Sequence, residues 1–308
     1  MRVFIGKDPL PQTSDALREA GATLVDTLGD AEAFICSGVG REGFPDLPDS
    51  VRWVQLCQAG IESFIDAGVV TRGPDGTRRW SNASGIYGLQ VAESAVGLLL
   101  NVLHLHTRIA RERTWDIAKE VDRRTRWLHG TTVGIIGAGG IGGHLIEMLA
   151  TFGAETVAVN MSGRTVDGAR ETYPYSRIDE VWPQVDHLIL SAPLTDETRG
   201  LVDADALAAC RDGVTVVNVA RGAVVDTDAL VEALRSGKVS GAGLDVTDPE
   251  PLPDDHPLWG MDTVAITTHA ANTKSSMDGQ LAPVVAENYR RFTAGETMVT
   301  ELDPDRGY

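Results

Sequence analysis

Three side chains in the second half of the chain have the types needed to act on a carboxylic acid: Arg221, Glu250 and His269. An arginine can hold a carboxylate, a histidine can move a proton, and a glutamate can fix the charge and orientation of that histidine. A glycine-rich turn upstream could hold a dinucleotide that carries electrons. Together these features predict hydride transfer to or from the α-carbon of a small 2-hydroxy or 2-keto acid.

The glycine-rich turn, GAGGIG at residues 137–142, has the spacing of a dinucleotide-binding turn. An apolar run expected to form a strand, residues 132–136, precedes it, and an expected helix over residues 141–152 follows. The first glycine permits a tight turn, the second lets the backbone approach a pyrophosphate, and the third lets the helix pack on the strand. A ligand-free turn could have the same composition, but the complete strand–turn–helix context favours cofactor binding. The expected contacts are Gly137, Gly139, Gly140, Ile141 and Gly142.

The choice of dinucleotide depends on the end of the next expected strand, residues 156–160. An NAD site usually has an acid at this place to bind the ribose 2′-hydroxyl. Here Asn160 and Ser162 could instead donate hydrogen bonds to a 2′-phosphate, and Arg164 could pair with it. We therefore expect NADP(H) as the preferred cofactor. NAD(H) is the alternative, in which Arg164 is merely solvated and Asp167 takes the ribose.

The alternation of apolar runs with helical stretches predicts that α/β domains position these residues. In the first ninety residues, strands are expected at Val3–Ile5, Ala33–Cys36 and Val51–Leu56. A helix over Ser14–Ala20 should be capped by Thr13 and Ser14. A surface loop at residues 71–79 and a long helix from Val91 to Arg113 should follow. This part of the chain has no phosphate-binding turn of its own.

Further strands are expected downstream of the glycine turn, at His187–Ser191, Val214–Val219, Gly241–Val246 and Val264–Thr267. Helices between them predict a parallel, doubly wound sheet with right-handed crossovers. We expect a Rossmann-type cofactor domain at residues 91–271. Residues 1–90 and 272–308, with a helix near 280–293, should form a flavodoxin-like substrate domain, and the active site should lie in the cleft between the two.

The composition limits the setting in which the protein works. The net charge of −17 argues against nucleic acid as a partner, and the three cysteines are too few and too scattered for a disulfide framework. We see no signal peptide, and the apolar run at residues 96–105 is too short to span a bilayer. We expect a soluble cytoplasmic protein without a metal site. Only four lysines accompany 23 arginines, and 27 of the 44 acids are Asp. This composition favours a halophilic surface over that of an ordinary acidic protein from a GC-rich genome.

The order of three motifs resembles the D-isomer-specific 2-hydroxyacid dehydrogenases. The motifs are NVARGAVVD at residues 218–226, GLDV at 243–246 with PEPLP at 249–253, and TTHAA at 267–271. With the glycine turn, the resemblance covers nearly the whole chain and is strongest from Thr131 to Ala271. The acidic, lysine-poor composition is similar to that of a haloarchaeal member.

The resemblance implies a role for each residue. Arg221 should grip the substrate carboxylate and the neighbouring 2-oxygen. His269 should be the general acid in keto-acid reduction and the general base in hydroxy-acid oxidation. Glu250 should hold the other ring nitrogen and favour the imidazolium. Asp245 should contact the nicotinamide carboxamide, and Ala220 should belong to the cofactor site. Any one of these residues alone would be read as structural, but the ordered set favours catalysis.

The first domain should complete the substrate site. The resemblance implies that the backbone N–H groups of Ala59 and Gly60 bind the carboxylate, although Ala-Gly after a strand is also a common turn. Tyr87, Cys57 and Met277 could line the pocket, whose shape no motif fixes. The family often has Arg or Ser where this chain has Gly140, which removes one phosphate contact.

The expected reaction is reduction of a 2-keto acid to the D-2-hydroxy acid, with hydride from C4 of the nicotinamide. The resemblance implies a homodimer, with the helix over residues 91–113 as an interface element. Two alternatives remain open. Enzymes that oxidise formate or phosphite share the scaffold, but Glu250 argues against them. A dinucleotide-sensing, corepressor-like binding protein without turnover is the alternative from another class.

Overall fold

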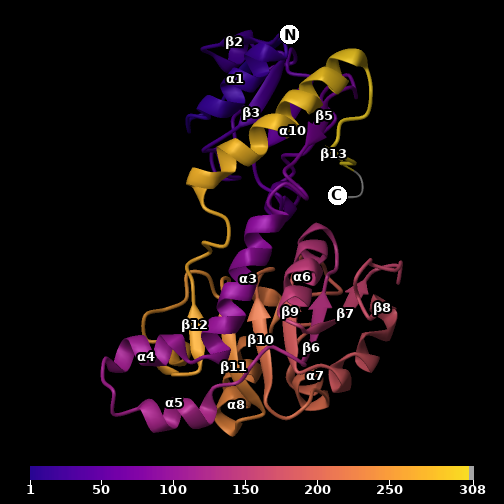
Figure 1. Ribbon diagram of the computed structural model, residues 1–308. Coiled ribbons are helices and arrows are strands. Elements are labelled where there is room, and N and C mark those ends of the chain that lie inside the picture. Colours follow the sequence, from indigo (N-terminus) through magenta and orange to yellow (C-terminus); the bar gives the residue numbers. More distant parts are fainter. Residues whose placement is uncertain (305–308) are drawn as a thin grey trace. The chain divides into compact units, whose positions relative to one another are not determined.

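The computed structural model describes residues 1–304, and the chain divides into two compact units. Unit 1 comprises residues 1–87 and the segment from residue 273 onward, and unit 2 comprises residues 88–272. Each unit is built around its own, largely parallel sheet (Figure 1). The predicted fold class, two α/β domains with parallel sheets, is confirmed.

Unit 1 has a six-stranded sheet in the order β13-β5-β4-β3-β1-β2. All neighbours pair in parallel except β13, which pairs antiparallel with β5. The five parallel strands thus have the flavodoxin-like order. The elements are β1 (Arg2–Ile5), α1 (Pro11–Glu19), β2 (Thr23–Val25), the 3₁₀ turn η1 (Leu28–Asp30), β3 (Ala33–Cys36), β4 (Trp53–Leu56), α2 (Glu62–Asp66), β5 (Arg79–Ser81), α10 (Lys274–Ala294) and β13 (Glu301–Leu302).

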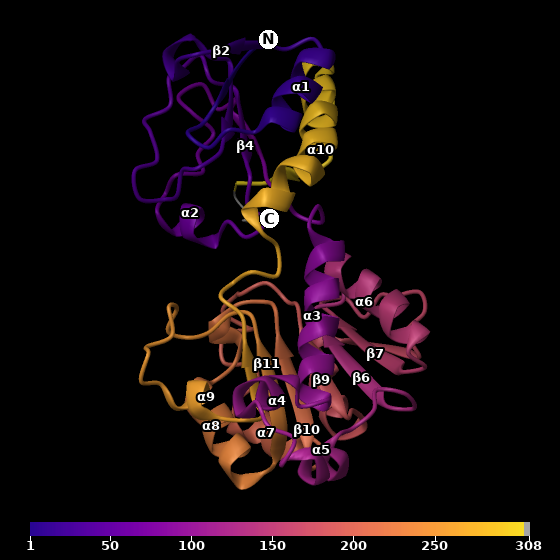
Figure 2. The same cartoon turned by 60° about the vertical axis from the view of Figure 1, so that its left-hand side comes forward.

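The helix α1 is capped by a distant residue and not by Thr13 and Ser14, so the predicted cap is wrong. The carboxylate of Asp278, on α10, accepts hydrogen bonds from the backbone N–H of Gln12 at 2.8 Å and of Thr13 at 2.9 Å. The Thr13 hydroxyl also donates to it, at 2.7 Å, while the Ser14 hydroxyl donates to the Leu10 carbonyl. Asp278 therefore ties α10 to α1, and Figure 2 shows the two helices side by side.

Unit 2 has a seven-stranded, all-parallel sheet in the order β12-β11-β10-β9-β6-β7-β8. Its first strand β6 lies in the middle, as in dinucleotide-binding sheets, and the strand order reverses between β6 and β9. The elements are α3 (Gly88–Leu103), α4 (His106–Glu112), α5 (Ala118–Arg124), β6 (Thr132–Ile136), α6 (Gly140–Thr151), β7 (Glu155–Asn160), β8 (Glu171–Pro174), η2 (Tyr175–Glu180), η3 (Trp182–Gln184), β9 (His187–Leu190), α7 (Ala204–Ala209), β10 (Val214–Asn218), η4 (Gly222–Val224), α8 (Thr227–Ser236), β11 (Val239–Leu244), α9 (Pro257–Gly260) and β12 (Val264–Ile266).

The central strands of unit 2 are apolar throughout because both faces of the sheet are covered. Ile135 and Val217 pack with α3 and α6 on one face, whereas Ile136 and Val216 pack with α7 and α8 on the other. This alternation follows from the two-residue period of a strand. The two cores hold the strands rigidly, so the loops at the strand ends have fixed starting points.

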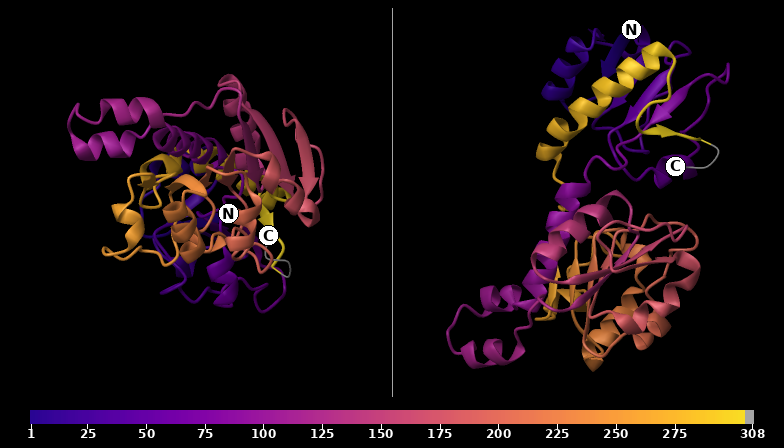
Figure 3. Two further views of the ribbon diagram at one scale, coloured as in Figure 1. Left: turned by 90° about the horizontal axis from the view of Figure 1, so that it is seen from below. Right: turned by 45° about the vertical axis from the view of Figure 1, so that its right-hand side comes forward.

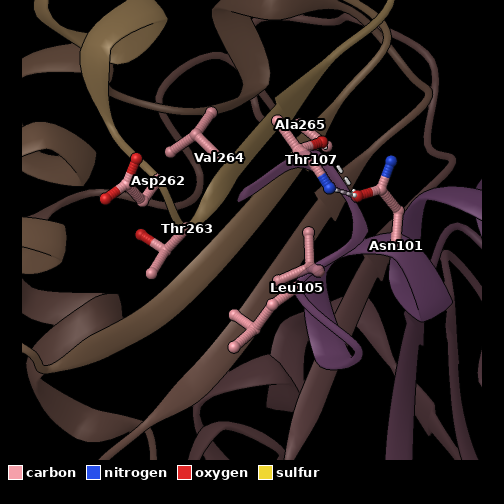
Figure 4. Close-up of a pocket in the computed structure, with 8 residues that line it drawn as sticks. Asn101, Leu105, Thr107, Asp262, Thr263, Val264 and Ala265 are labelled. Carbon is pink, nitrogen blue, oxygen red and sulfur yellow. Dashed lines mark hydrogen bonds between the residues drawn. The ribbon is translucent and has the colours of Figure 1, made fainter. Parts of the chain in front are cut away.

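The long helix predicted over residues 91–113 is wrong, since the chain turns at Leu105. Leu105 has a positive φ of 57° and stays buried. The Asn101 side-chain oxygen accepts hydrogen bonds from the Thr107 N–H at 3.0 Å and hydroxyl at 2.9 Å, so it caps α4 (Figure 4). As a result α4 and α5 project away from the sheet of unit 2 (Figure 3).

Sequence reasoning also missed four strands, β2, β5, β8 and β13, which lie at or next to the sheet edges and have two to four residues each. Strands this short carry too little periodicity to be recognised. Among the described residues no single helix is long and apolar enough to cross a membrane, and α3 together with α4, bent by 60°, is the one pair that meets the length and composition criteria.

Candidate functional site

The carboxyl-terminal edge of the unit 2 sheet collects most of the predicted site residues. The glycine turn follows β6, Asn160 ends β7, Arg221 follows β10, Asp245 follows β11 and His269 follows β12. Because all these strands are parallel, their carboxyl ends lie at one edge of the sheet. Residues up to about 130 positions apart in the sequence are thus brought to the same edge of one domain.

The glycine turn fits a dinucleotide phosphate. Gly137 has a φ of 96°, and a Cβ there would overlap the backbone of Ala192. Gly139 is the residue before the first turn of α6, and a Cβ on it would meet open space. No side chain caps α6 in the described structure, so the N-terminal N–H groups of the helix have no side-chain acceptor. A Cβ on Gly142 would crowd Ala138 at 3.2 Å, which agrees with close packing of helix and strand.

The loop after β7 is braced by its own polar side chains. The Asn160 amide donates to the Arg164 carbonyl at 2.7 Å, and the Ser162 hydroxyl lies 3.4 Å from the Asn160 side-chain oxygen. The Arg164 N–H in turn donates to the Ser162 hydroxyl at 3.3 Å. Asn160 and Ser162 therefore shape the loop, and the side chain of Arg164 is exposed beside them. No acid stands between residues 160 and 166.

His269 and Glu250 form the central pair of the site. The distance from His269 Nδ1 to Glu250 Oε1 is 2.7 Å, and the two side chains are 53% and 43% exposed. The second carboxylate oxygen of Glu250 accepts from the Thr247 N–H at 3.4 Å. Since Glu250 occupies Nδ1, a proton exchanged with a substrate must use Nε2 of His269.

Arg221 is held by Asn218, a buried residue that sequence reasoning missed. The Asn218 amide donates to the Arg221 carbonyl at 2.9 Å, and its oxygen accepts from the Ala220 N–H at 3.0 Å. The Arg221 guanidinium also donates to the Ala220 carbonyl at 2.7 Å. The sequence did contain a signal for this role, because Asn218 is a polar residue at the end of an otherwise apolar strand.

Gly222 packs the Arg221 turn against the Glu250 turn. A Cβ on Gly222 would overlap the carbonyl oxygen of Thr247 and lie 2.6 Å from Asp248 N. The Thr227 hydroxyl donates to the Asp248 carbonyl at 2.8 Å from the same side. Only glycine permits this backbone contact, which fixes the spacing of the two turns.

The carboxylate of Asp245 lies against the segment that carries His269. It accepts from the hydroxyl of Thr267 and from the N–H groups of Ala270 and Ala271, at 2.6 to 3.1 Å. The sequence predicted a contact with the nicotinamide for this residue. The structure places its oxygen atoms on protein donors.

The predicted substrate residues Ala59, Gly60 and Tyr87 belong to unit 1. The Tyr87 hydroxyl donates to the Cys57 carbonyl at 2.7 Å, and burial raises the pKa of both side chains. The Asn82 amide donates to the Ala59 carbonyl at 2.9 Å. Tyr87 and Asn82 thus brace this loop, and the substrate roles of Ala59, Gly60 and Tyr87 stay predictions.

Two hollows in the surface lie away from the Arg221, Glu250 and His269 side chains, and the first lies beside α4. It has an empty volume of about 140 Å³ and lies at the amino-terminal end of β12, beside Leu105 and Asp262 (Figure 4). A second hollow, of about 230 Å³, lies beneath Gly222 and Thr247. Neither is lined by Arg221, Glu250 or His269, so the hydrogen-bond geometry, and not cavity size, identifies the site.

Residues 94–271 match the family model described as D-isomer specific 2-hydroxyacid dehydrogenase, NAD binding domain. The chain belongs to this family. A protein of Corynebacterium melassecola, described as an uncharacterized protein in the proB 3′ region, is 43% identical over 297 residues, which are 96% of each chain. Formate dehydrogenase 2 of Oryza sativa is 37% identical over 206 residues, which are 65% of this chain and 53% of that protein.

Among solved structures, a D-isomer specific 2-hydroxyacid dehydrogenase from Xanthobacter autotrophicus, crystallised with NADPH and MES, superposes with a TM-score of 0.82. It is 26% identical to this chain, and the match covers 100% of this chain and 99% of the other. The fold is therefore shown over the whole chain, and the family match covers residues 94–271.

Proposed function

We propose that this family member reduces 2-keto acids to D-2-hydroxy acids, with His269 as the proton donor and acceptor. The 2.7 Å contact between His269 Nδ1 and Glu250 carries the proposal, because it fixes one ring nitrogen and leaves Nε2 for the substrate. Arg221, on the neighbouring turn, supplies a planar set of donors for the substrate carboxylate.

The groups divide the reaction between them. When bound, the reduced nicotinamide supplies a hydride to C2 of the keto acid. The Nε2–H of His269 gives its proton to the 2-oxygen, so the carbonyl becomes a hydroxyl. Glu250 accepts the hydrogen bond from Nδ1–H and compensates the charge of the ring before transfer. In the oxidation direction the same atoms take the proton back.

Because one relative is a formate dehydrogenase, formate must be tested as an alternative substrate. Formate oxidation releases CO₂ and leaves no hydroxyl proton to accept, so the Glu250–His269 pair favours a hydroxy-acid reaction. The test follows the nicotinamide absorbance in concentrated KCl with short and branched 2-keto acids, and with formate and NAD(P)⁺. Turnover of a keto acid would support the proposal. Turnover of formate alone would overturn it, and cofactor binding without any turnover would support dinucleotide sensing.

We further propose NADP(H) as the preferred cofactor, with NAD(H) as a weaker one. The braced loop after β7 has no acid that would repel a 2′-phosphate, and Arg164 is exposed beside it. The relative from Xanthobacter was crystallised with NADPH. Initial rates with NADPH and NADH at equal concentrations test this preference directly.

We also propose a cytoplasmic, halophilic homodimer that binds neither nucleic acid nor membranes. The net charge of −17 supports a surface that needs screening by salt, and the three buried free cysteines suit a reducing compartment.

Residues 104–129 carry seven basic residues against four acids, and Trp115 within them is 91% exposed. This basic projection, α4 and α5, complements the acidic remainder of a second copy. Ultracentrifugation of Trp115→Ala should show loss of the dimer.

A further inference from the structure

Asp245 stands at the end of β11, and the segment that carries His269 wraps around it. Its side chain is only 2% exposed. Oδ1 accepts from the Thr267 hydroxyl at 2.6 Å, from the Ala270 N–H at 2.8 Å and from the Ala271 N–H at 3.1 Å. Oδ2 lies 3.1 Å from the same Ala271 N. A buried carboxylate with this many donors is one of the strongest hydrogen-bonding centres a protein can build.

His269 itself is fixed to the same residue through its backbone. Its N–H donates to the Asp245 carbonyl at 2.8 Å, and the Asp245 N–H donates to the Asn218 carbonyl at 3.0 Å. Asp245 therefore binds the residues before, at and after His269. It also anchors them to β10, the strand that leads into the Arg221 turn.

The backbone of His269 needs such an anchor. Its φ is 53°, in the left-handed region that residues with a Cβ rarely adopt. A conformation of this kind persists only where the surroundings impose it. The hydrogen bonds from Ala270 and Ala271 to the carboxylate hold the chain immediately after His269, at the point where relaxation to an ordinary φ would start.

We propose that Asp245 is a positioning residue, whose buried carboxylate holds His269 in the left-handed conformation that places Nδ1 on Glu250. The proposal rests on His269 being the proton donor of the reaction. It differs from the contact with the nicotinamide that the sequence predicts, because the carboxylate acts here through protein donors. Loss of the Asp245 charge should release residues 267–271 and disturb the His269–Glu250 pair. Its effect on cofactor binding should be much smaller.

The variant Asp245→Asn keeps the size of the side chain but places an amide nitrogen where a carboxylate oxygen accepts a hydrogen bond. We expect kcat for keto-acid reduction to fall about 100-fold, the cost of misplacing a reacting group by about 1 Å. The dissociation constant for NADPH, measured by fluorescence, should stay within about twofold.

A second variant and a second measurement separate positioning from folding and from turnover. Thr267→Val removes one donor and keeps the charge, so its loss in kcat should be about tenfold and thus intermediate. In ¹⁵N-histidine spectra, His269 is assigned by His269→Gln, and its signal in Asp245→Asn should resemble that in Glu250→Gln. A wild-type His269 signal in Asp245→Asn would overturn the proposal, whether or not NADPH binding weakens. An altered signal in a protein that reduces no keto acid would support the positioning role and overturn the proposed function.

Discussion

The two edges of the unit 2 sheet each carry a histidine, and the surroundings of the two side chains are opposite. At the carboxyl-terminal edge, His269 is half exposed, paired with Glu250 and fixed through its backbone. At the amino-terminal edge, His187 begins β9 and is 2% exposed, and neither of its ring nitrogens has a hydrogen-bond partner among the described residues. One sheet thus holds one histidine with a carboxylate partner and one that burial keeps neutral.

The polar residues around the two histidines differ in the same way. At the amino-terminal edge, Arg126 donates to the Gly213 carbonyl and the Thr215 hydroxyl, both at 2.7 Å, and to the Ser240 hydroxyl. These groups satisfy one another inside the protein. At the other edge the side chains of Asn218 and Asp245 hydrogen-bond to the loops that carry Arg221 and His269. A histidine with a carboxylate partner and a supported backbone is therefore the better functional candidate, and burial alone is not a sign of function.

The largest effect should come from exchanging the histidines one at a time. His269→Gln should lower kcat about 1,000-fold, because the proton donor is lost, and leave the NADPH dissociation constant unchanged. His187→Leu is the matched control, and its kcat should stay within about twofold of wild type. Steady-state kinetics and fluorescence titration check both variants. Full activity of His269→Gln would show that His269 does not transfer the proton. The two histidines would then not differ in function.

The buried histidine should instead make stability depend on pH. Burial, with a smaller contribution from Arg126, lowers the pKa of His187 from 6.5 to about 4, and Asp186 offsets this only in part. Between these two values the unfolded chain binds a proton that the folded chain does not, so the free energy of unfolding rises with pH. The contribution is complete above pH 6.5 and is lost as the pH falls to about 4. It amounts to about 3 kcal/mol.

Denaturant unfolding of wild type and His187→Leu across this range measures the contribution. The difference in the free energy of unfolding between the two proteins should change by about 3 kcal/mol from pH 7 to pH 4, with the wild type losing more. Leucine fills the site and leaves no polar group without a partner, which suits it to this comparison. Parallel curves for the two proteins would show that His187 takes up its proton at the same pH in the folded and the unfolded chain.

A substitution at Gly222 tests whether turnover depends on the backbone contact between the Arg221 turn and the Glu250 turn. In Gly222→Ala the new Cβ must displace the turn at Thr247 and with it Glu250, so we expect kcat to fall about tenfold. Gly260→Ala is the matched control, because a Cβ there meets no atom within 4 Å. Equal kcat values for the two variants would mean that the spacing of the Arg221 and Glu250 turns does not matter for turnover.

The sequence predicts the parts of this molecule that depend on local patterns. Apolar runs such as Val214–Val219 become buried strands, and the glycine turn has its own spacing, so the domains and the family follow from them. The cap of α1 comes from Asp278, 265 residues away from Thr13, and no local pattern contains it. The turn at Leu105 depends on one asparagine side chain against an otherwise helical sequence. The support of His269 by Asp245 likewise requires a fold in which two neighbouring strands end together.

The narrowest effect, confined to the choice of cofactor, should come from the loop after β7, which belongs to the carboxyl-terminal edge but is braced independently of His269. Because the Asn160 amide holds the Arg164 carbonyl, Asn160→Asp would change the loop and the charge together. Arg164→Ala changes only the exposed side chain. We expect the KM for NADPH to rise about tenfold, the value of one charge-assisted contact, and the KM for NADH to stay the same. Arg164→Lys should restore part of the preference. An unchanged ratio of the two KM values in Arg164→Ala would show that this edge binds the 2′-phosphate through other residues or does not distinguish the two cofactors.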